Sequence, residues 1–214
     1  MPPLQQTPTG RDARDDCPLL GPGQSPGGVW GEAPSFRMNP AWHIRTARLD
    51  LEPVGWGNLS DLVAIKGDPG VFAVMLGGVR GPALVAAELA AEISAWGALG
   101  YGVWAVRDVQ GRVFRGLTGL QARPDGRGVA VRFAFWPDAQ GRGLAREAAG
   151  AALRFGHDQA GLERIVGVAR EENIASRTVL GGIGMVEAER FMQGGYEMVL
   201  YESVRVSPAR PGSV

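Results

Sequence analysis

The 214-residue chain carries 22 lysines and arginines against 22 aspartates and glutamates, so its formal net charge is zero. Proteins that bind nucleic acid usually have a clustered basic excess, and this balance therefore argues against a nucleic-acid partner. The chain has one cysteine, Cys17, which excludes an intrachain disulfide and favours a cytoplasmic location. Because the chain has two histidines besides, a metal site built from histidine and cysteine ligands is not expected.

The sequence gives no sign of a membrane or export segment. No apolar run reaches the length of about 18 residues that a membrane-spanning helix needs. Charged residues are frequent over positions 11–16, where a secretory signal would have its apolar core. We therefore expect a protein that has no membrane partner and is not exported.

Both ends of the chain have the composition of tails. Proline and glycine are frequent over residues 1–40, and no apolar period appears there. This composition predicts a flexible tail, followed by one domain over residues 41–204 and a second tail over 205–214. Met38 precedes the first strand-like segment and is a candidate start of the native chain.

Apolar periodicity predicts alternating strands and helices in the central part of the chain. Asn58 is expected to cap the first helix, and Leu84 and Leu89 to belong to the apolar face of the second. Because hairpins alternate with crossovers, the order predicts an α/β (α+β) fold, a mixed sheet flanked by helices. In chain order the elements are a strand over 42–54, helices over 58–68 and 82–99, strands over 101–106, 113–121 and 129–136, a helix over 143–158, a strand over 164–169, a helix over 173–183, and strands over 185–191 and 196–204.

The most informative segment is the passage from a strand into a helix over residues 133–147, which reads FAFWPDAQGRGLARE. Gly141 and Gly143 remove side chains where the backbone turns, and the first-turn N–H groups of the helix lack intrahelical partners. Those donors favour a bound phosphate, and Arg142 and Arg146 can add charge-assisted hydrogen bonds. A dinucleotide fingerprint would have a third glycine where Arg146 stands, so a nucleotide-binding domain is the weakest interpretation.

A second helix start follows the next strand and reads ENIASR over residues 172–177. Asn173 is expected to cap this helix. Ser176 stands three residues later and faces the same way, a position that capping does not explain. Its hydroxyl is either an ordinary exposed serine or part of a site.

Three segments together resemble a known family. The loop is similar to the Q/R-x-x-G-x-G/A loop of the GNAT superfamily of acetyl-CoA-dependent N-acetyltransferases, and its residues are Gln140, Gly141, Arg142, Gly143, Leu144 and Ala145. The NIAS of residues 173–176, with VL at 179–180 and GM at 184–185, resembles a segment of the RimJ/RimL-like branch. Residues 44–49, IRTARL, resemble that branch's opening strand, which often reads T-x-R-L. The resemblance covers residues 42–204.

The resemblance implies a mostly antiparallel sheet that splays open after residue 136, with acetyl-CoA in the notch. It implies that the pantetheine pairs with the strand that holds Phe133 and Phe135, and that Asn173 contacts the cofactor. It also implies that the pyrophosphate lies on the N–H groups of residues 140–145. No metal belongs to this chemistry.

The resemblance also implies a reaction. The acceptor would be a primary amine of a small molecule or a protein N-terminus, which takes the acetyl group directly in a ternary complex. Ser176 would lie near the thioester sulfur and assist the leaving thiolate, with Tyr196 and Tyr201 as alternatives. A backbone N–H of the strand over 133–136 would stabilise the oxyanion.

The chain departs from the branch at two positions. Ala130 stands where the branch often has a glutamate, and Arg132 replaces a small residue. Water, Glu88 or Glu92 would then take the proton of the amine. Two functional interpretations therefore stay open: an N-acetyltransferase, or an acyl-CoA-binding regulatory or interaction module on the same fold. The oligomeric state, monomer or homodimer, is open as well.

Overall fold

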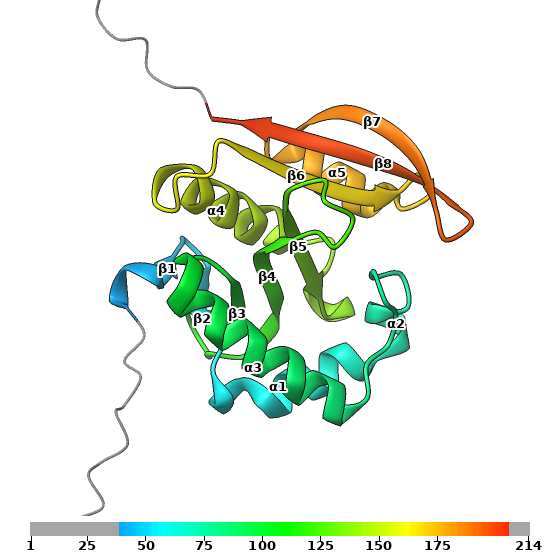
Figure 1. The fold of residues 1–214 in the computed structure, drawn as a ribbon. Coiled ribbons are helices and arrows are strands. Elements are labelled where there is room, and N and C mark those ends of the chain that lie inside the picture. Colours follow the sequence, from blue (N-terminus) through cyan, green and yellow to red (C-terminus); the bar gives the residue numbers. More distant parts are fainter. Residues whose placement is uncertain (1–38, 206–214) are drawn as a thin grey trace, which may run out of the picture. The chain divides into compact units, whose positions relative to one another are not determined.

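The computed structural model describes residues 39–205, which all belong to one compact unit of the chain (Figure 1). Cys17 and nearly all of the tails predicted over residues 1–40 and 205–214 lie outside the described residues. The division into a domain and two tails therefore stays a prediction.

The predicted order of elements is largely that of the structure. The strands are β1 (Ile44–Arg45), β2 (Leu49–Pro53), β3 (Val103–Asp108), β4 (Phe114–Ala122), β5 (Val129–Phe135), β6 (Arg164–Arg170), β7 (Val186–Gln193) and β8 (Tyr196–Val204). The α-helices are α1 (Leu59–Gly67), α2 (Pro69–Phe72), α3 (Pro82–Leu99), α4 (Leu144–Asp158) and α5 (Ile174–Gly182). Three short 3-10 helices, η1 (Pro40–Trp42), η2 (Trp56–Asn58) and η3 (Pro137–Ala139), precede β1, α1 and α4.

The strands form one eight-stranded sheet in the order β1-β2-β3-β4-β5-β6-β8-β7. Every neighbouring pair is antiparallel except β5 and β6, which are parallel. Their pairing is confined to Val129 with Ile165 and Ala130 with Val166. Beyond these pairs the two strands separate (Figure 1). The predicted fold class, a mixed and mostly antiparallel splayed sheet flanked by helices, is confirmed.

Helices cover both faces of the sheet because side chains alternate along each strand. On β5, Val131 and Phe135 belong to the core that α4 completes. Ala134 belongs to the other core, which Leu62 of α1 and Leu89 of α3 complete. The helices on both faces hold β5 in place. The edge of β5 that faces away from β4 lies at the opening toward β6.

The first predicted strand, over residues 42–54, is wrong as a single element. Thr46 closes a turn between β1 and β2: its N–H donates to the Leu49 carbonyl, and its Oγ1 accepts from the Leu49 N–H at 3.0 Å. Trp42 and Ile44 stand at even positions and Leu49 and Leu51 at odd positions, so the apolar alternation changes phase across this turn. The single-strand prediction overlooked that change. The turn brings Arg48 beside α4.

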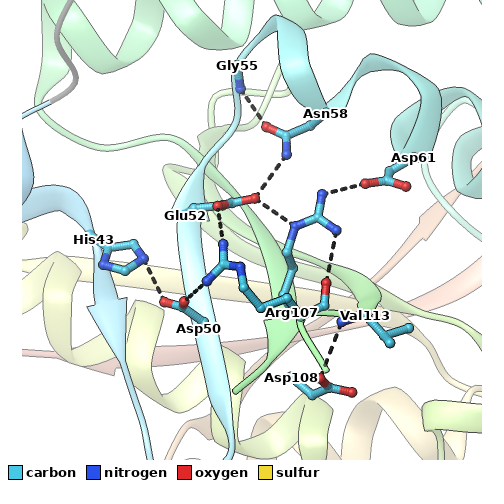
Figure 2. A network of polar contacts seen from close by, with 10 residues as sticks. His43, Asp50, Glu52, Gly55, Asn58, Asp61, Arg107, Asp108 and Val113 are labelled. Carbon is cyan, nitrogen blue, oxygen red and sulfur yellow. Dashed lines mark hydrogen bonds and ion pairs between the residues drawn. The ribbon is translucent and has the colours of Figure 1, made fainter. Parts of the chain in front are cut away.

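Two helix predictions also need correction. Asn58 precedes α1, but its side chain accepts from the Gly55 N–H and donates to Glu52 instead of capping the helix (Figure 2). On α3, Leu84 is 51% exposed and Val85 takes the buried position beside Leu89. The alanine-rich sequence of α3 gives little contrast between its faces, so the prediction was wrong for Leu84, while Leu89 is buried as predicted.

By length and composition alone, α3 is apolar enough to cross a membrane, with a mean hydropathy of 1.2 over its 18 residues. This finding corrects the expectation that no segment reaches that limit. In the described fold Leu89 and Trp96 are fully buried in the cores, while Glu92 binds Lys66 of α1. These contacts pack one side of α3 against the domain.

Candidate functional site

The opening between β5 and β6 exposes a strand edge inside the sheet. The Trp136 N–H donates to the carbonyl of Arg115 in β4 at 3.1 Å. Because backbone groups alternate along a strand, those of Ala134 also face β4, and those of Phe133 and Phe135 face the opening. The Phe135 carbonyl accepts from the Gln140 side chain at 2.9 Å. Phe133 therefore presents backbone groups where β6 has separated.

The loop after β5 leads this edge to the start of α4. Gly141 and Gly143 have φ angles of 69° and 74°, in the left-handed region that favours glycine. The Glu147 N–H donates to the Gly143 carbonyl at 3.1 Å. The N–H groups of Leu144 and Ala145 precede this bond and are two of the donors that a helix leaves unpaired at its start. The loop thus has the geometry of an anion site, as the sequence predicts.

A brace from the β1–β2 turn holds the start of α4. Glu147 accepts hydrogen bonds from the Thr46 hydroxyl at 2.6 Å and from the Arg48 Nε at 2.7 Å. The Arg48 Nη1 donates to the Arg142 carbonyl at 2.9 Å. Partial burial would raise the pKa of Glu147, but hydrogen bonds from Thr46 and Arg48 hold it below its ordinary value. Sequence reasoning missed this role of the T-x-R-L motif, because Glu147 is distant in the chain.

A cleft of about 690 Å³ joins the strand edge, the loop and the start of α5. Arg142 is not among its lining residues; its side chain is exposed and its carbonyl accepts from Arg48. Val74 and Met75, which follow α2, close the cleft and were not predicted. Of the residues singled out from the sequence, the cleft is lined by Phe133, Phe135, Gln140, Gly141, Gly143, Leu144, Ala145, Arg146, Asn173 and Ser176.

The start of α5 is built as the sequence predicts. The Asn173 Oδ1 accepts from the Ser176 N–H at 3.0 Å, so Asn173 is the N-cap. Among residues 39–205, the Ser176 hydroxyl makes no hydrogen bond to protein. Ser176 lines the 690 Å³ cleft and also a smaller cavity of about 240 Å³ beside it. A free hydroxyl therefore lies where the two hollows meet.

The two tyrosines differ in position. Tyr196 lines the 240 Å³ cavity, and the Arg170 guanidinium stacks 3.5 Å from its ring centroid. Tyr201 is buried, and its hydroxyl accepts from the Arg177 Nε at 3.2 Å. The structure thus brings Tyr196 near Ser176 and leaves Tyr201 in the core.

The candidate proton acceptors lie apart from the Ser176 hydroxyl. Ala130 lines the 240 Å³ cavity where a glutamate was considered. Glu88 and Glu92 line a third hollow of about 380 Å³, and each binds the Lys66 Nζ at 3.0 Å. Burial raises the pKa of Glu92 despite Lys66. Arg132 lies between this hollow and the 240 Å³ cavity and lines both.

The described residues hold no cluster of three or more histidine, cysteine or acidic side chains that could bind a metal ion. The cleft instead combines free backbone donors, an uncapped helix start and one free hydroxyl. These groups suit an elongated ligand with phosphate at one end and a reacting centre at the other.

Comparison with known proteins gives the family. The model of the GNAT acetyltransferase domain matches residues 48–186. No curated protein sequence matches the chain. A Bordetella pertussis protein described as a GnaT-family acetyltransferase is 24% identical, with a TM-score of 0.67, and the match covers 77% of this chain and 99% of that one.

Two further solved structures share the fold. The ribosomal alpha-N-protein acetyltransferase RimL, in complex with coenzyme A, is 13% identical with a TM-score of 0.64, over 76% of this chain and 98% of that one. A spermidine N-acetyltransferase mutant from Vibrio cholerae is 16% identical with a TM-score of 0.60, over 75% and 95%. The family model and these folds agree with the RimJ/RimL-like motifs. The chain therefore belongs to the GNAT family of acyl-CoA-dependent N-acetyltransferases.

Proposed function

We propose that the protein transfers an acetyl group from acetyl-CoA directly to a primary amine while both substrates are bound. One observation carries the proposal. The free backbone edge of β5 leads within a single cleft from the Ser176 hydroxyl to the uncapped start of α4. This arrangement offers one place for a phosphate and another for a thioester.

In the proposed complex, the cofactor lies along β5. Its pyrophosphate accepts from the backbone N–H groups of Gly141, Arg142, Gly143, Leu144 and Ala145, with the helix dipole of α4 favouring the negative charge. The Gln140 N–H already donates to the Pro137 carbonyl at 3.2 Å and is not free for the phosphate. Its pantetheine pairs with the carbonyl of Phe133 and with the N–H of Phe135, since the Phe135 carbonyl already accepts from Gln140. The side-chain amide of Asn173 contacts it from the other wall of the cleft.

The chemistry needs a neutral amine, an oxyanion donor and a protonated leaving group. The amine nitrogen bonds to the thioester carbon, the carbon–sulfur bond breaks, and one amine proton is lost. The Phe133 N–H is placed to stabilise the oxyanion. The Ser176 hydroxyl donates to the departing sulfur, and Tyr196 is the alternative donor across the smaller cavity.

Water is the proposed acceptor of the amine proton. Glu88 and Glu92 do not line the cavities that Ser176 lines, and both bind Lys66. A chain-terminal amine titrates near 8, so a useful fraction is neutral at physiological pH. The acceptor in this proposal is a protein N-terminus or a small-molecule amine, and the reaction takes place in the cytoplasm.

Gly143→Asp tests the cofactor site. A Cβ and a negative charge would enter the phosphate site, so the dissociation constant for acetyl-CoA should rise about 10-fold or more. The control is Gly161→Asp, which makes the same change at a φ of 68° outside the cleft. Calorimetry should show weakened binding for Gly143→Asp alone. Equal affinities in both folded variants would refute the loop assignment.

A second candidate is an acyl-CoA-binding regulatory or interaction module, and Ala130 favours it because no glutamate stands there. Release of free thiol from acetyl-CoA with a panel of amines separates the two functions. Turnover supports the transferase. Tight acetyl-CoA binding without turnover of any amine supports the binding module.

A further inference from the structure

The cavity beside Ser176 has an unbalanced charge. Its charged lining residues are Arg123, Arg132 and Arg170, and no aspartate or glutamate lines it among the described residues. In the proposed function this 240 Å³ cavity receives the acceptor, because it adjoins the thioester end of the cofactor cleft. Its charge therefore bears on which amines can enter.

Two of the three arginines are engaged by the protein. Arg123 binds Asp125, with Nη2 2.5 Å from Oδ2. The Arg170 Nη1 lies 3.5 Å from the Glu172 carboxylate, and its guanidinium stacks on Tyr196. These carboxylates offset part of the charge of Arg123 and Arg170, and the contacts explain where the two side chains lie.

Arg132 has no such explanation. Its side chain is largely buried, its Nη1 donates to the Gln121 Oε1 at 3.1 Å, and no carboxylate within 4.0 Å pairs with it among residues 39–205. Burial first, then the like charges of Arg80 and Arg123, lower its pKa. An arginine still stays protonated in a protein, so the cation is destabilised in this position unless an anion joins it.

The carboxylates on the far side of Arg132, Glu88 and Glu92, act on it by charge, but neither forms an ion pair with it among the described residues, and the Glu92 Oε2 is buried without a hydrogen-bond partner. In the 380 Å³ hollow, Glu88 and Glu92 both bind Lys66, and Glu88 also accepts from Arg80 at 2.8 Å. The two hollows together contain two carboxylates, Glu88 and Glu92, against five cations, Lys66, Arg80, Arg123, Arg132 and Arg170. Apart from Arg132 itself, the 380 Å³ hollow is balanced, with two cations and two carboxylates, and the positive excess lies on the side of the 240 Å³ cavity.

We propose that the acceptor is an amine that also carries a carboxylate, and that Arg132 binds this carboxylate. A guanidinium fork matches a carboxylate in a bidentate geometry, and the interaction is strong where water is excluded. The same site repels a second ammonium group, so polyamines are poor acceptors. The inference rests on the proposed function and narrows its substrate class.

The test compares three amines with the same four-carbon chain. These are 4-aminobutyrate, butylamine and 1,4-diaminobutane, which end in a carboxylate, a methyl group and an ammonium. Initial rates of thiol release from acetyl-CoA should give kcat/KM in that order, with the carboxylate about 10-fold or more above the methyl group. Equal values, or a preference for 1,4-diaminobutane, would overturn the inference.

Arg132→Gln identifies the group responsible. It should remove the preference for 4-aminobutyrate and leave kcat/KM for butylamine within about 3-fold, while acetyl-CoA affinity persists. The control Arg164→Gln makes the same charge change at a residue that pairs with Glu202 and lines neither hollow. The control should keep the preference. Loss of preference in both variants, or in neither, would contradict the role of Arg132.

Binding of the products gives a second measurement that needs no turnover and no variant. N-acetyl-4-aminobutyrate should bind the complex with coenzyme A about 10-fold more tightly than N-acetylbutylamine in calorimetry. Absence of this difference would overturn the inference while leaving the proposed transferase intact. Failure of the proposed function would instead appear as absent acetyl-CoA binding, or as binding without thiol release from any amine.

Discussion

Arg107 and Arg132 belong to the same sheet and differ in what the protein gives them. Arg107, on β3, binds Glu52 at 2.8 Å and Asp61 of α1 at 2.6 Å (Figure 2). Burial would lower its pKa, but the hydrogen bonds that it donates to these carboxylates raise it. Among the described residues Arg132, on β5, has only an amide partner, and burial lowers its pKa. A polar group satisfied by the protein contributes to the fold, and a polar group left open toward a cavity is available to a ligand.

The largest expected effect is on stability. Arg107→Gln leaves Asp61 without its cation and Glu52 with Arg112 alone, and should lower the free energy of unfolding by about 2 kcal/mol, less than for a fully buried pair. Arg132→Gln removes an unpaired cation and should change that free energy by less than about 1 kcal/mol. Urea unfolding of both variants measures the difference. Equal losses would break the comparison between the two arginines.

Ser176→Ala applies the comparison to a neutral group. Its hydroxyl has no protein partner among the described residues, so stability and acetyl-CoA affinity should persist while kcat falls about 10–100-fold. Ser94→Ala is the control, because the Ser94 hydroxyl donates to the Ala90 carbonyl within α3. Steady-state kinetics with a working acceptor measures the effect. An unchanged kcat would assign the hydrogen bond to the departing sulfur to Tyr196 instead. Loss of stability would make Ser176 a structural residue.

Glu147→Gln gives the smallest effect, because Glu147 is satisfied by the protein yet adjoins the cofactor loop. The loosened brace should weaken acetyl-CoA binding by about 2- to 5-fold and stability at pH 7 by up to about 1 kcal/mol. The folded protein lowers the pKa of Glu147 below its ordinary value of 4.5. Its charged form therefore stabilises the fold at pH values above 4.5, and this contribution is lost as the pH falls through the lowered pKa.

The stability of Glu147→Gln and of the unaltered protein should therefore converge below pH 4.5. Calorimetry and urea unfolding at pH 7 and pH 4 check both effects. A difference in stability that widens in acid would contradict the assigned direction of the pKa.

The sequence predicts what depends on near neighbours in the chain. The glycines at 141 and 143 and the N-cap Asn173 act within a few residues, and the structure has the loop and the cap where they were expected. The opening between β5 and β6 was predicted through the family resemblance. The turn at Thr46 was missed, although the apolar alternation changes phase between Ile44 and Leu49.

What could not be predicted depends on distant residues. The brace joins Arg48 to Glu147 across 99 positions, and no local pattern pairs them. Arg132 was noted as a departure from the family. Its proposed role depends on the absence of a paired carboxylate among the described residues. That absence can be seen only from the positions of Glu88 and Glu92 in space. The phase of α3 likewise required its packing, since Leu84 and Val85 are equally apolar.

The short pairing of β5 with β6 has a consequence for handling the protein. An unpaired strand edge is a template on which another chain can add a strand, and proteins usually cover such edges. Here the edge lies in the middle of the sheet and, in the proposed complex, the pantetheine covers it. Coenzyme A should therefore slow aggregation during concentration and storage, as well as occupying the cleft. The cofactor would then also act as a chemical chaperone for the enzyme that uses it.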